Sequence, residues 1–475
     1  MRQPRRRRHH ARRYRQRRRI TLLVAGLFIA LLLAGVIVLE HPNSRPITHP
    51  PRKITPSTRV ASTSSTTIPT PKATWQIAWG SAMAWGYGVA TDVTIRDLVT
   101  VTVGGSAIRI RFTNIYGNAP LKVGEATVGL SAGGSKVIEG TMRFLTFNGM
   151  PSVNVPQGQS LYSDPLAMPV QGGETLAITF YVDAPDLVSQ HTWSPSTVSY
   201  FTPNFGGNIT NSYESTGFTL NGNEMRWIDA IDVSPTTNNG AIVVIGDSIS
   251  DGFHSAVSWT QVLQSRIDSL QLSERRPVIN EAITANALLP STPTFRTDEF
   301  DGGGEPGLNR FARDALTQSG VSEVVLFLGT NDLWFGASAH SVIQGYKAAI
   351  AMAHAAGVRI IGATLIPRKS SVKEKWTLKD QVNIERVDHW IRTSNAFDGV
   401  IDFASVVSDR FNGQCLSTSM FPPYDSGDHL HPNPAGQTAM GNAIDPSVLR
   451  LPPMATVPAL VDVTNTSNCA TTSPG

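Results

Sequence analysis

Apolar residues alternate with polar ones from about position 75 to the middle of this sequence. Ile108, Ile110 and Phe112 show the pattern, and residues 175–182 repeat it after a Gly-Gly pair. A period of two, interrupted by glycine-rich turns, is typical of strands with one buried face. We therefore predict an all-β, sandwich-like domain over residues 75–236. Its length of about 160 residues is enough to bury a core of its own.

In the second half, short apolar runs alternate with stretches of helical spacing. The runs predict strands at 241–246, 277–283, 323–329, 359–366 and 399–404, and the stretches predict helices near 253–270, 306–318, 339–356, 378–394 and 434–444. Strands that alternate with helices are typical of a parallel sheet covered on both faces. We predict a three-layer, flavodoxin-like α/β domain with a parallel sheet over residues 240–450.

The N-terminal region has a different pattern. Residues 1–19 contain eleven arginines and no acidic residue, and residues 20–39 are continuously apolar apart from small interruptions. Twenty such residues span a bilayer, and the arginines would stay on the cytoplasmic side. We predict a single-pass transmembrane anchor with the rest of the chain outside the cytoplasm. A cleaved signal peptide is the alternative, although residues 36–40 contain no small-x-small cleavage site.

Composition changes the interpretation of the charge. The formal net charge is +4, and it becomes −7 once the eleven arginines of the tail are set aside. A mildly acidic body argues against nucleic acid or anionic lipid as its substrate. The arginine block could itself bind nucleic acid, but its place beside an apolar span favours the membrane.

Two segments and two cysteines complete the domain organisation. Residues 40–74 are rich in Pro, Ser and Thr and predict an extended linker, and residues 451–475 predict a partly ordered tail. Cys415 and Cys469 are the two cysteines. A bond between them would stabilise the fold by about 4 kcal/mol in the chain-entropy model. Two free thiols are the alternative, because sequence does not show proximity.

Polar or small residues follow three of the predicted strands. Ser248 lies in Gly-Asp-Ser-Ile after the run 241–245, Ala285 follows the strand near 277–283, and Asn331 lies in Gly-Thr-Asn-Asp after the strand near 323–329. The carboxyl ends of parallel strands are where an open α/β sheet builds its site. Alone, Gly-Asp-Ser could equally be an ordinary turn or helix N-cap, and Asn331 could be a turn residue.

Asp428 and His431 supply the chemistry that a serine needs. A serine hydroxyl is a weak nucleophile and requires a base, and imidazole titrates closest to neutrality. Asp428, three residues before His431, can accept the other ring N–H and fix the tautomer. Asn433, between two prolines, predicts the N-cap of the helix that follows and so a stiff loop for the pair. His429 is a rival base, at a tighter spacing from Asp428.

Other polar residues are expected to have structural roles. His254, His340, His354 and His389 lie in apparently helical stretches, where solvent-facing or structural positions are expected. Asp332 is expected to be a structural hydrogen-bond acceptor. The sequence shows no cluster with metal-ligand spacing and no phosphate-binding glycine loop.

In their order and positions, the Gly-Asp-Ser block, the Gly-Thr-Asn-Asp block and the Asp-x-x-His pair resemble the GDSL (SGNH) serine hydrolase family. The resemblance covers about residues 240–450. It implies ester hydrolysis through an acyl-enzyme, with no metal or organic cofactor. It also implies three oxyanion donors: the Ser248 backbone N–H, the Ala285 backbone N–H and the Asn331 side-chain amide. The family usually has glycine at the second position, so Ala285 is a departure that could crowd the acyl pocket.

These inferences together predict a membrane-anchored extracytoplasmic serine esterase with the triad Ser248, His431 and Asp428. The substrate would be an acyl ester, with O-acyl groups of polysaccharides suited to an exported enzyme with a β-sandwich companion. A lipase or small-ester esterase is one alternative. A surface glycan-binding protein with a weakly active hydrolase-like domain is another, and Ala285 is the feature that favours it.

Overall fold

The computed structural model describes residues 75–191, 197–293, 303–368, 377–409 and 419–458. All of them belong to one compact unit, Pro69–Gly475. The predicted arginine tail, anchor and linker lie outside the described residues, as do Cys415, Cys469 and most of the predicted C-terminal tail. In the part of the chain that is described, no helix is both long and apolar enough to cross a membrane.

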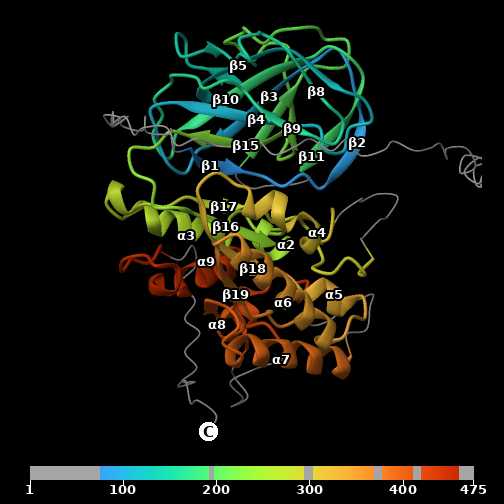
Figure 1. Cartoon of the computed structure of the whole chain (residues 1–475), viewed down its shortest axis with the longest axis vertical. Helices are drawn as coiled ribbons and strands as arrows, with labels where there is room; N and C mark the ends of the chain where they lie inside the picture. Colours follow the sequence, from blue (N-terminus) through green and yellow to red (C-terminus); the bar gives the residue numbers. More distant parts are fainter. Residues whose placement is uncertain (1–74, 192–196, 294–302, 369–376, 410–418, 459–475) are drawn as a thin grey trace, which may run out of the picture. The chain divides into compact units, whose positions relative to one another are not determined.

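Residues 76–233 form an antiparallel region, here called the β-rich part (Figure 1). Its strands are β1 Gln76–Gly80, β2 Trp85–Ala90, β3 Val93–Thr100, β4 Ile108–Thr113, β5 Leu121–Gly133, β6 Lys136–Val137, β7 Arg143–Phe144, β8 Val153–Val155, β9 Ser160–Tyr162, β10 Thr175–Val182, β11 Asp186–His191, β12 Thr197–Phe201, β13 Thr219–Gly222, β14 Met225–Arg226 and β15 Ile228–Val233.

The strands of the β-rich part form three sheets, ordered β1-β15-β4-β9, β13-β12-β3-β10-β5-β6 and β14-β11-β2, with β7 and β8 also paired to β5. The predicted alternation is present in β4, where Ile108, Ile110 and Phe112 are fully buried. Phe112 packs edge-on against Phe180 of β10, with ring centroids 5.4 Å apart, so strands of different sheets share one core. The region is therefore sheet-rich and antiparallel, as the alternation predicted.

Residues 241–449 alternate strands and helices and are called the α/β part. The strands are β16 Ala241–Gly246, β17 Val278–Asn280, β18 Val321–Phe327, β19 Arg359–Ala363 and β20 Gly399–Ile401. The helices are α2 Ser248–Asp251, α3 Trp259–Asp268, α4 Gly307–Phe311, α5 Thr330–Trp334, α6 Ala339–Ala355, α7 Leu378–Thr393, α8 Phe403–Val407 and α9 Pro434–Ala443, with short 3-10 turns η1 Leu272–Glu274, η3 Pro422–Tyr424 and η4 Pro446–Leu449 and a π-helical segment η2 Ala312–Leu316.

The five strands of the α/β part form a parallel sheet in the order β17-β16-β18-β19-β20. Numbered by sequence, this is the order 2-1-3-4-5 of flavodoxin-like folds. Helices α3, α8 and α9 lie on one side of the sheet and α4 and α6 on the other (Figure 1). The order reverses between β16 and β18, so the carboxyl ends of these two strands border the crevice where such folds bind ligands.

The predicted helix over 253–270 is wrong at its start. The structure has a four-residue helix α2, a turn, and then α3 from Trp259. Gly252 ends α2 with a φ of 88°, in the left-handed region that glycine adopts most easily. Ser258 then starts α3 with a capping box, in which its side chain accepts from the Gln261 N–H and the Gln261 side chain accepts from the Ser258 N–H.

The β-rich and α/β parts contact each other through buried polar groups. Arg111 of β4 donates to Asp229 of β15 at 2.6 Å and to the side chain of Gln318 at 3.2 Å. Gln318, which lies between η2 and β18, in turn donates to Glu281 at 2.9 Å. Glu281 is 1% exposed, and burial raises the pKa of its carboxyl well above the usual value. The contact between the parts therefore includes a buried hydrogen-bond network.

Candidate active site

Ser248 is the first residue of α2 and follows the inner strand β16. All six residues of β16 are buried, and Asp247 caps the helix by accepting from the Ile249 N–H at 3.0 Å. Burial raises the pKa of Asp247 to about 7. Ser248 itself is only 6% exposed, and its backbone N–H donates to none of the residues that the structure describes. The strand-to-helix turn thus presents both its hydroxyl and its N–H.

The predicted nucleophile, base and orienter are brought together. The Oγ of Ser248 lies 2.8 Å from the Nε2 of His431, and the Nδ1 of His431 lies 2.5 Å from the Oδ2 of Asp428. The other carboxylate oxygen of Asp428 accepts from the backbone N–H groups of Leu430 and His431. Burial alone would raise the pKa of Asp428, but these bonds and the charge of His431 hold it well below its usual range. Asp428 is therefore ionised at neutral pH.

The loop that carries His431 is fixed at its C-terminal side. Asn433 caps α9 by accepting from the Gly436 N–H at 3.0 Å, and Pro434 occupies the first helical turn, as predicted. The side-chain amide of Asn433 also donates to the carbonyl oxygens of Pro423 and Asp425. These bonds hold the loop against the preceding segment, so the imidazole has a defined position.

Ala285 lies in a tight turn after β17. The N–H of Asn286 donates to the carbonyl of Ile283 at 3.0 Å, which closes a four-residue turn with Thr284 and Ala285 in its centre. Ala285 has a φ of 64° and Thr284 has no positive φ, which is the pattern of a type II turn. That turn favours glycine at the Ala285 position. The Ala285 N–H donates to none of the described residues.

Asn331 lies in the first turn of α5, after β18. Its Nδ2 donates to the carbonyl of Asn286 at 2.9 Å, and its Oδ1 lies 3.4 Å from the Nη1 of Arg368. Gly329 precedes it with a φ of 129°, a conformation that side-chain-bearing residues rarely adopt. The structure thus brings Ser248, Ala285 and Asn331 to adjacent strand ends at one edge of the sheet.

The rival residues lie elsewhere or have other partners. His429 is exposed and pairs with Asp425 at 2.7 Å. His354 is also on the surface and pairs with Asp398 at 2.9 Å. Asp332 is the structural acceptor that was expected: its carboxylate accepts from the backbone of Leu288 and Leu289 and from the Thr292 hydroxyl.

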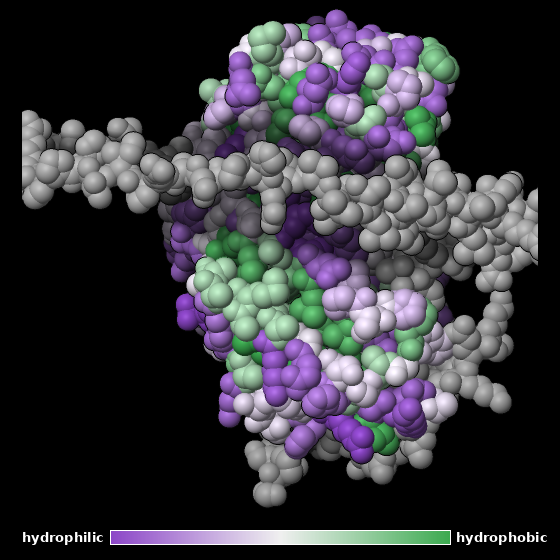
Figure 2. Space-filling model, turned by 45° about the vertical axis from the view of Figure 1, so that its right-hand side comes forward, coloured by the Kyte–Doolittle hydropathy of each residue, from purple (hydrophilic) through white to green (hydrophobic). Residues whose placement is uncertain are grey.

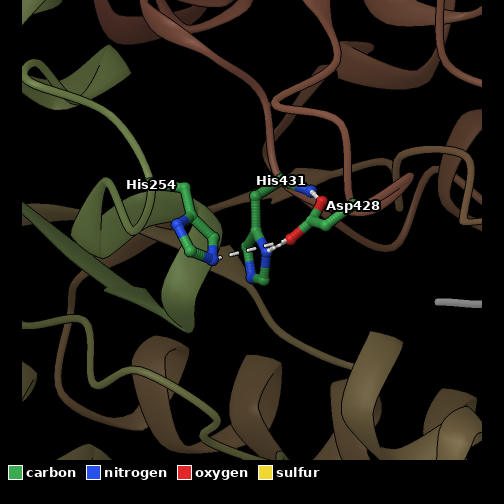
Figure 3. A group of neighbouring side chains, drawn as sticks. All are labelled: His254, Asp428 and His431. Atoms are coloured by element: carbon green, nitrogen blue, oxygen red, sulfur yellow. Dashed lines mark hydrogen bonds and ion pairs between the residues drawn. The ribbon is translucent and has the colours of Figure 1, made fainter. Parts of the chain in front are cut away.

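His254 was expected in a helix with a solvent-facing or structural role; the structure places it in a turn instead of a helix, with its side chain 52% exposed. It lies in the turn between α2 and α3 with a φ of 61°, and its ring points toward His431 and Asp428 (Figure 3). Its Nε2 is 3.9 Å from the Oδ2 of Asp428, and its ring centroid is 5.5 Å from that of His431. No local pattern indicates that His254 approaches His431, because the two residues are far apart along the chain.

His254, Asp428 and His431 also form a possible ligand set for a metal ion. One ligand atom from each lies within 4.8 Å of the other two. Two imidazoles and one carboxylate are a known zinc ligand combination. The Nδ1 of His431 already faces Asp428, however, so a metal there would compete with the hydrogen bond that orients the base.

The arrangement can activate a hydroxyl and stabilise an oxyanion. A serine next to a histidine, which is itself held by an ionised carboxylate, is the geometry of acyl transfer. Residues 244–439, which contain every residue of this site, match the GDSL-like Lipase/Acylhydrolase family. This segment is a GDSL-like lipase/acylhydrolase domain. The chain thus contains an esterase/acylhydrolase domain of the GDSL type, as its motifs predicted, and is an enzyme.

Solved structures of a lipase and of esterases are similar to part of this chain. A GDSL-like lipase from Bacteroides thetaiotaomicron is 16% identical and covers 44% of this chain and 88% of its own, with a TM-score of 0.33. The aryl esterase of M. smegmatis is 17% identical and covers 45% and 99%, with a TM-score of 0.35. A catalytic mutant of an acetylxylan esterase from Geobacillus stearothermophilus is 14% identical and covers 46% and 96%, with a TM-score of 0.34. No curated protein sequence matches this one significantly.

Proposed function

We propose that this GDSL-type enzyme is a serine esterase in which Ser248 attacks the carbonyl of an acyl ester, His431 is the general base and Asp428 orients His431. One observation carries the proposal: the 2.8 Å contact between the Ser248 hydroxyl and the Nε2 of His431, with Asp428 on the other nitrogen of the ring. Asp428 keeps the ring proton on Nδ1, so that Nε2 is free to accept the serine proton.

In the first half of the reaction, Ser248 Oγ attacks the ester carbon while its proton passes to His431 Nε2. The carbonyl oxygen becomes an oxyanion, and the N–H groups of Ser248 and Ala285 and the amide of Asn331 are the proposed donors to it. One such donor is worth roughly 3–4 kcal/mol of transition-state stabilisation. Collapse of the tetrahedral intermediate breaks the bond to the alcohol oxygen, which leaves with the proton from His431.

In the second half, a water molecule hydrolyses the acyl-serine. His431 removes a proton from the water, the resulting tetrahedral intermediate uses the same oxyanion donors, and Ser248 leaves with the proton from His431. The ionised Asp428 stabilises the imidazolium that forms in both halves, because its carboxylate is 2.5 Å from Nδ1. The products are the free acid and regenerated Ser248.

We further propose that the substrate has a short acyl group on a polar alcohol, such as an O-acetyl group on a polysaccharide. The methyl group of Ala285 takes space beside the proposed acyl position, where glycine would leave it open. The large exposed hydrophobic residues are not in the segments that contain Ser248, Ala285, Asn331 and His431: among the described residues they are Val89, Ile138, Phe144, Met150, Phe205 and Leu220 of the β-rich part and Leu272.

The distribution of these hydrophobic residues makes a lipid surface the less favoured substrate. Leu272 precedes the amino end of β17, whereas Ser248 follows the carboxyl end of the parallel strand β16. The two residues therefore lie at opposite ends of the strands. On the face shown in Figure 2, the hydrophobic residues of the β-rich part are scattered among hydrophilic ones. A continuous apolar surface around the site is what docking on a lipid interface would require. Long-chain lipid esters are therefore the second candidate.

The location of the enzyme is also a proposal. Residues 20–39 would anchor it in the membrane, with the arginine tail in the cytoplasm and the catalytic body outside. The support is the length of the apolar stretch and the charge asymmetry across it. The Pro, Ser and Thr-rich linker would then hold the body away from the bilayer, where it could reach envelope or environmental glycans.

A fluorophosphonate probe and a chromogenic acetyl ester test the mechanism together. Wild type should label and turn over, whereas Ser248→Ala should do neither, and His431→Ala should lose most turnover with the double variant little worse than either single one. His429→Ala is the matched control, because His429 pairs with Asp425 instead of the triad, and it should keep most activity. Near wild-type turnover by Ser248→Ala would refute the nucleophile assignment, and an unlabelled wild type would favour the glycan-binding alternative.

A further inference from the structure

His191, the last residue of β11, joins the β-rich part to the helix that begins with Ser248. Its side chain is 2% exposed, and its Nδ1 lies 2.7 Å from the carbonyl oxygen of Ala82. A carbonyl only accepts, so Nδ1 carries a proton, and a hydrogen bond from Nε2 to a carboxylate requires a second ring proton, as in the imidazolium form. The Nε2 lies 3.3 Å from the Oδ1 of Asp251, the last residue of α2. A ring from the β-rich part thus contacts a carboxylate three residues after the nucleophile.

Asp251 also contacts the turn that contains Ala285. Its second oxygen, Oδ2, accepts from both the N–H and the hydroxyl of Thr284, at 3.1 and 2.7 Å. Asp251, Thr284 and His191 are all at least 95% buried, so water does not compete for these bonds. One carboxylate therefore connects β11, α2 and the turn after β17.

The turn at Thr284 and Ala285 needs support because alanine does not favour its geometry. Type I and type II turns differ by a flip of their central peptide group, which here is the group between Thr284 and Ala285 that carries the Ala285 N–H. Alanine prefers negative φ and so the type I geometry, whereas Ala285 has a φ of 64°. A flip would turn the Ala285 N–H away from its proposed target. With glycine at this position, the type II turn would hold by itself.

The two ends of the turn are held in different ways. At its C-terminal end, the backbone carbonyl of Asn286 accepts from the side-chain amide of Asn331 at 2.9 Å, and the side-chain oxygen of Asn286 accepts from the guanidinium of Arg310 at 2.9 Å. These partners all belong to the α/β part. Thr284, at the other end, is held by Asp251, and Asp251 by His191. The N-terminal end of the turn is therefore the one whose support extends into the β-rich part.

We propose that His191 is a positioning residue for the ester hydrolysis described above: through Asp251 and Thr284 it keeps the turn in the geometry that aims the Ala285 N–H at the oxyanion. The inference rests on the proposed function, because it presupposes that Ala285 is an oxyanion donor. It gives the β-rich part a role in turnover. It also relates that role to the presence of alanine where the family usually has glycine.

The first test compares His191→Leu and His191→Gln in the full chain, with kcat and KM for a chromogenic acetyl ester. Loss of one oxyanion donor costs roughly 100- to 1,000-fold in rate. A donor that is only partly misaligned should cost less, so His191→Leu should lower kcat about 10- to 100-fold and leave KM within about threefold. His191→Gln retains an N–H donor and should recover part of the loss. His354→Leu, which breaks a surface histidine–aspartate pair, is the matched control and should keep its kcat.

The second test separates positioning from general loss of structure. In an Ala285→Gly background the type II turn no longer needs the contacts of His191 and Asp251 to hold it. His191→Leu should then lower kcat by less than about threefold. A defect in folding alone would persist in that background. If His191→Leu folds poorly, His191→Gln carries the same comparison.

Three outcomes would reject either the positioning role of His191 or the esterase mechanism. An unchanged kcat in both His191 variants, with Ser248→Ala inactive, would overturn the positioning role and leave the esterase mechanism standing. An equal kcat loss with and without Ala285→Gly would assign His191 a purely structural role and also overturn the proposal. An active Ser248→Ala would instead reject the mechanism on which the proposal rests.

Discussion

The side-chain amide of Asn331 donates a hydrogen bond to the backbone carbonyl of Asn286, with 2.9 Å between the two heavy atoms. Asn331 follows β18 and Asn286 follows β17, and β16 lies between these strands in the sheet. The bond therefore joins two strand ends across the strand that leads into Ser248. An amide nitrogen has two hydrogens, so one remains for the proposed oxyanion.

Replacing this amide should affect the rate more than substrate affinity. We expect Asn331→Ala to lower kcat roughly 100- to 1,000-fold with little change in KM, because the donor acts on charge that develops in the transition state. Steady-state kinetics on an acetyl ester measure both. Asn442→Ala is a matched control: its amide also donates to a backbone carbonyl, that of Val457, but away from the site. An effect confined to KM would make Asn331 a substrate-binding residue instead.

Asp428→Asn should preserve the fold and lower turnover by roughly four orders of magnitude, because the amide favours the wrong tautomer of His431. Asp425→Asn is the parallel change at the neighbouring pair with His429 and should cost far less. Turnover and circular dichroism of the two variants check this. The reverse ranking would move the base from His431 to His429.

Asp428 should also make the stability of the folded protein depend on pH. The pKa of Asp428 in the folded protein lies well below its usual range, whereas in the unfolded chain it should be about 4. The ionised carboxylate therefore stabilises the fold above about pH 4, and this contribution is lost as the pH falls below that value. Melting temperatures of wild type and Asp428→Asn should differ at pH 5 to 7 and converge toward pH 3. A constant difference at all pH values would contradict the assignment.

Ala285→Gly should widen the range of acyl groups. Removal of the methyl group should raise kcat/KM for butyryl and octanoyl esters relative to acetyl esters of the same alcohol. Its effect on stability should be small. Glycine relieves the strain of a φ of 64° but adds freedom to the unfolded chain, each worth up to about 1 kcal/mol. An unchanged chain-length preference would show that the methyl group does not limit the acyl pocket.

Zinc should inhibit the enzyme through His254. A Zn²⁺ ion bound by His254, Asp428 and His431 would occupy a ring nitrogen of His431 that contacts Ser248 or Asp428, so turnover should fall with added zinc and return with EDTA. We expect His254→Ala to need roughly tenfold more zinc for half-inhibition, by loss of one ligand. His354→Ala should show the wild-type zinc response. Equal zinc sensitivity in the His254 variant would rule out this site.

The N-terminal segment should fractionate with membranes. If residues 20–39 span the bilayer, protease treatment of intact cells should remove the body and spare the arginine tail. Tags at each end of the chain would report the two fragments. Recovery of a soluble protein that starts after residue 39 would show that the segment is cleaved.

The local sequence predicted the bounds of β16 well and those of the neighbouring strand β17 less well. β16 has the predicted bounds, because six consecutive residues are buried on both faces of the sheet and no polar residue interrupts them. β17 ends at Asn280, whereas the predicted strand continued through Glu281 to Ile283. The chain leaves the sheet there to form the turn at Ala285. An apolar run shows that residues are buried, but not that they remain hydrogen-bonded as a strand.

Contacts between distant segments could not be predicted in the same way. Gly252 and the capping pair Ser258 and Gln261 were readable signals for the break between α2 and α3. Nothing local to His191 or His254 indicates that their rings approach the site. Both positions depend on how separate segments pack, and a single sequence does not contain that information in its periodicity.

The hydrophobic cluster of the α/β part also includes Ile77 of β1 and Ala230 of β15, two fully buried residues of the β-rich part. Beside them lies Glu281, whose partner Gln318 is held by Arg111 from the β-rich part. A cut between β15 and β16 would therefore open a hydrophobic core and expose a buried carboxyl. The two parts should therefore unfold together, and the segment that matches the hydrolase family covers only part of this structural unit.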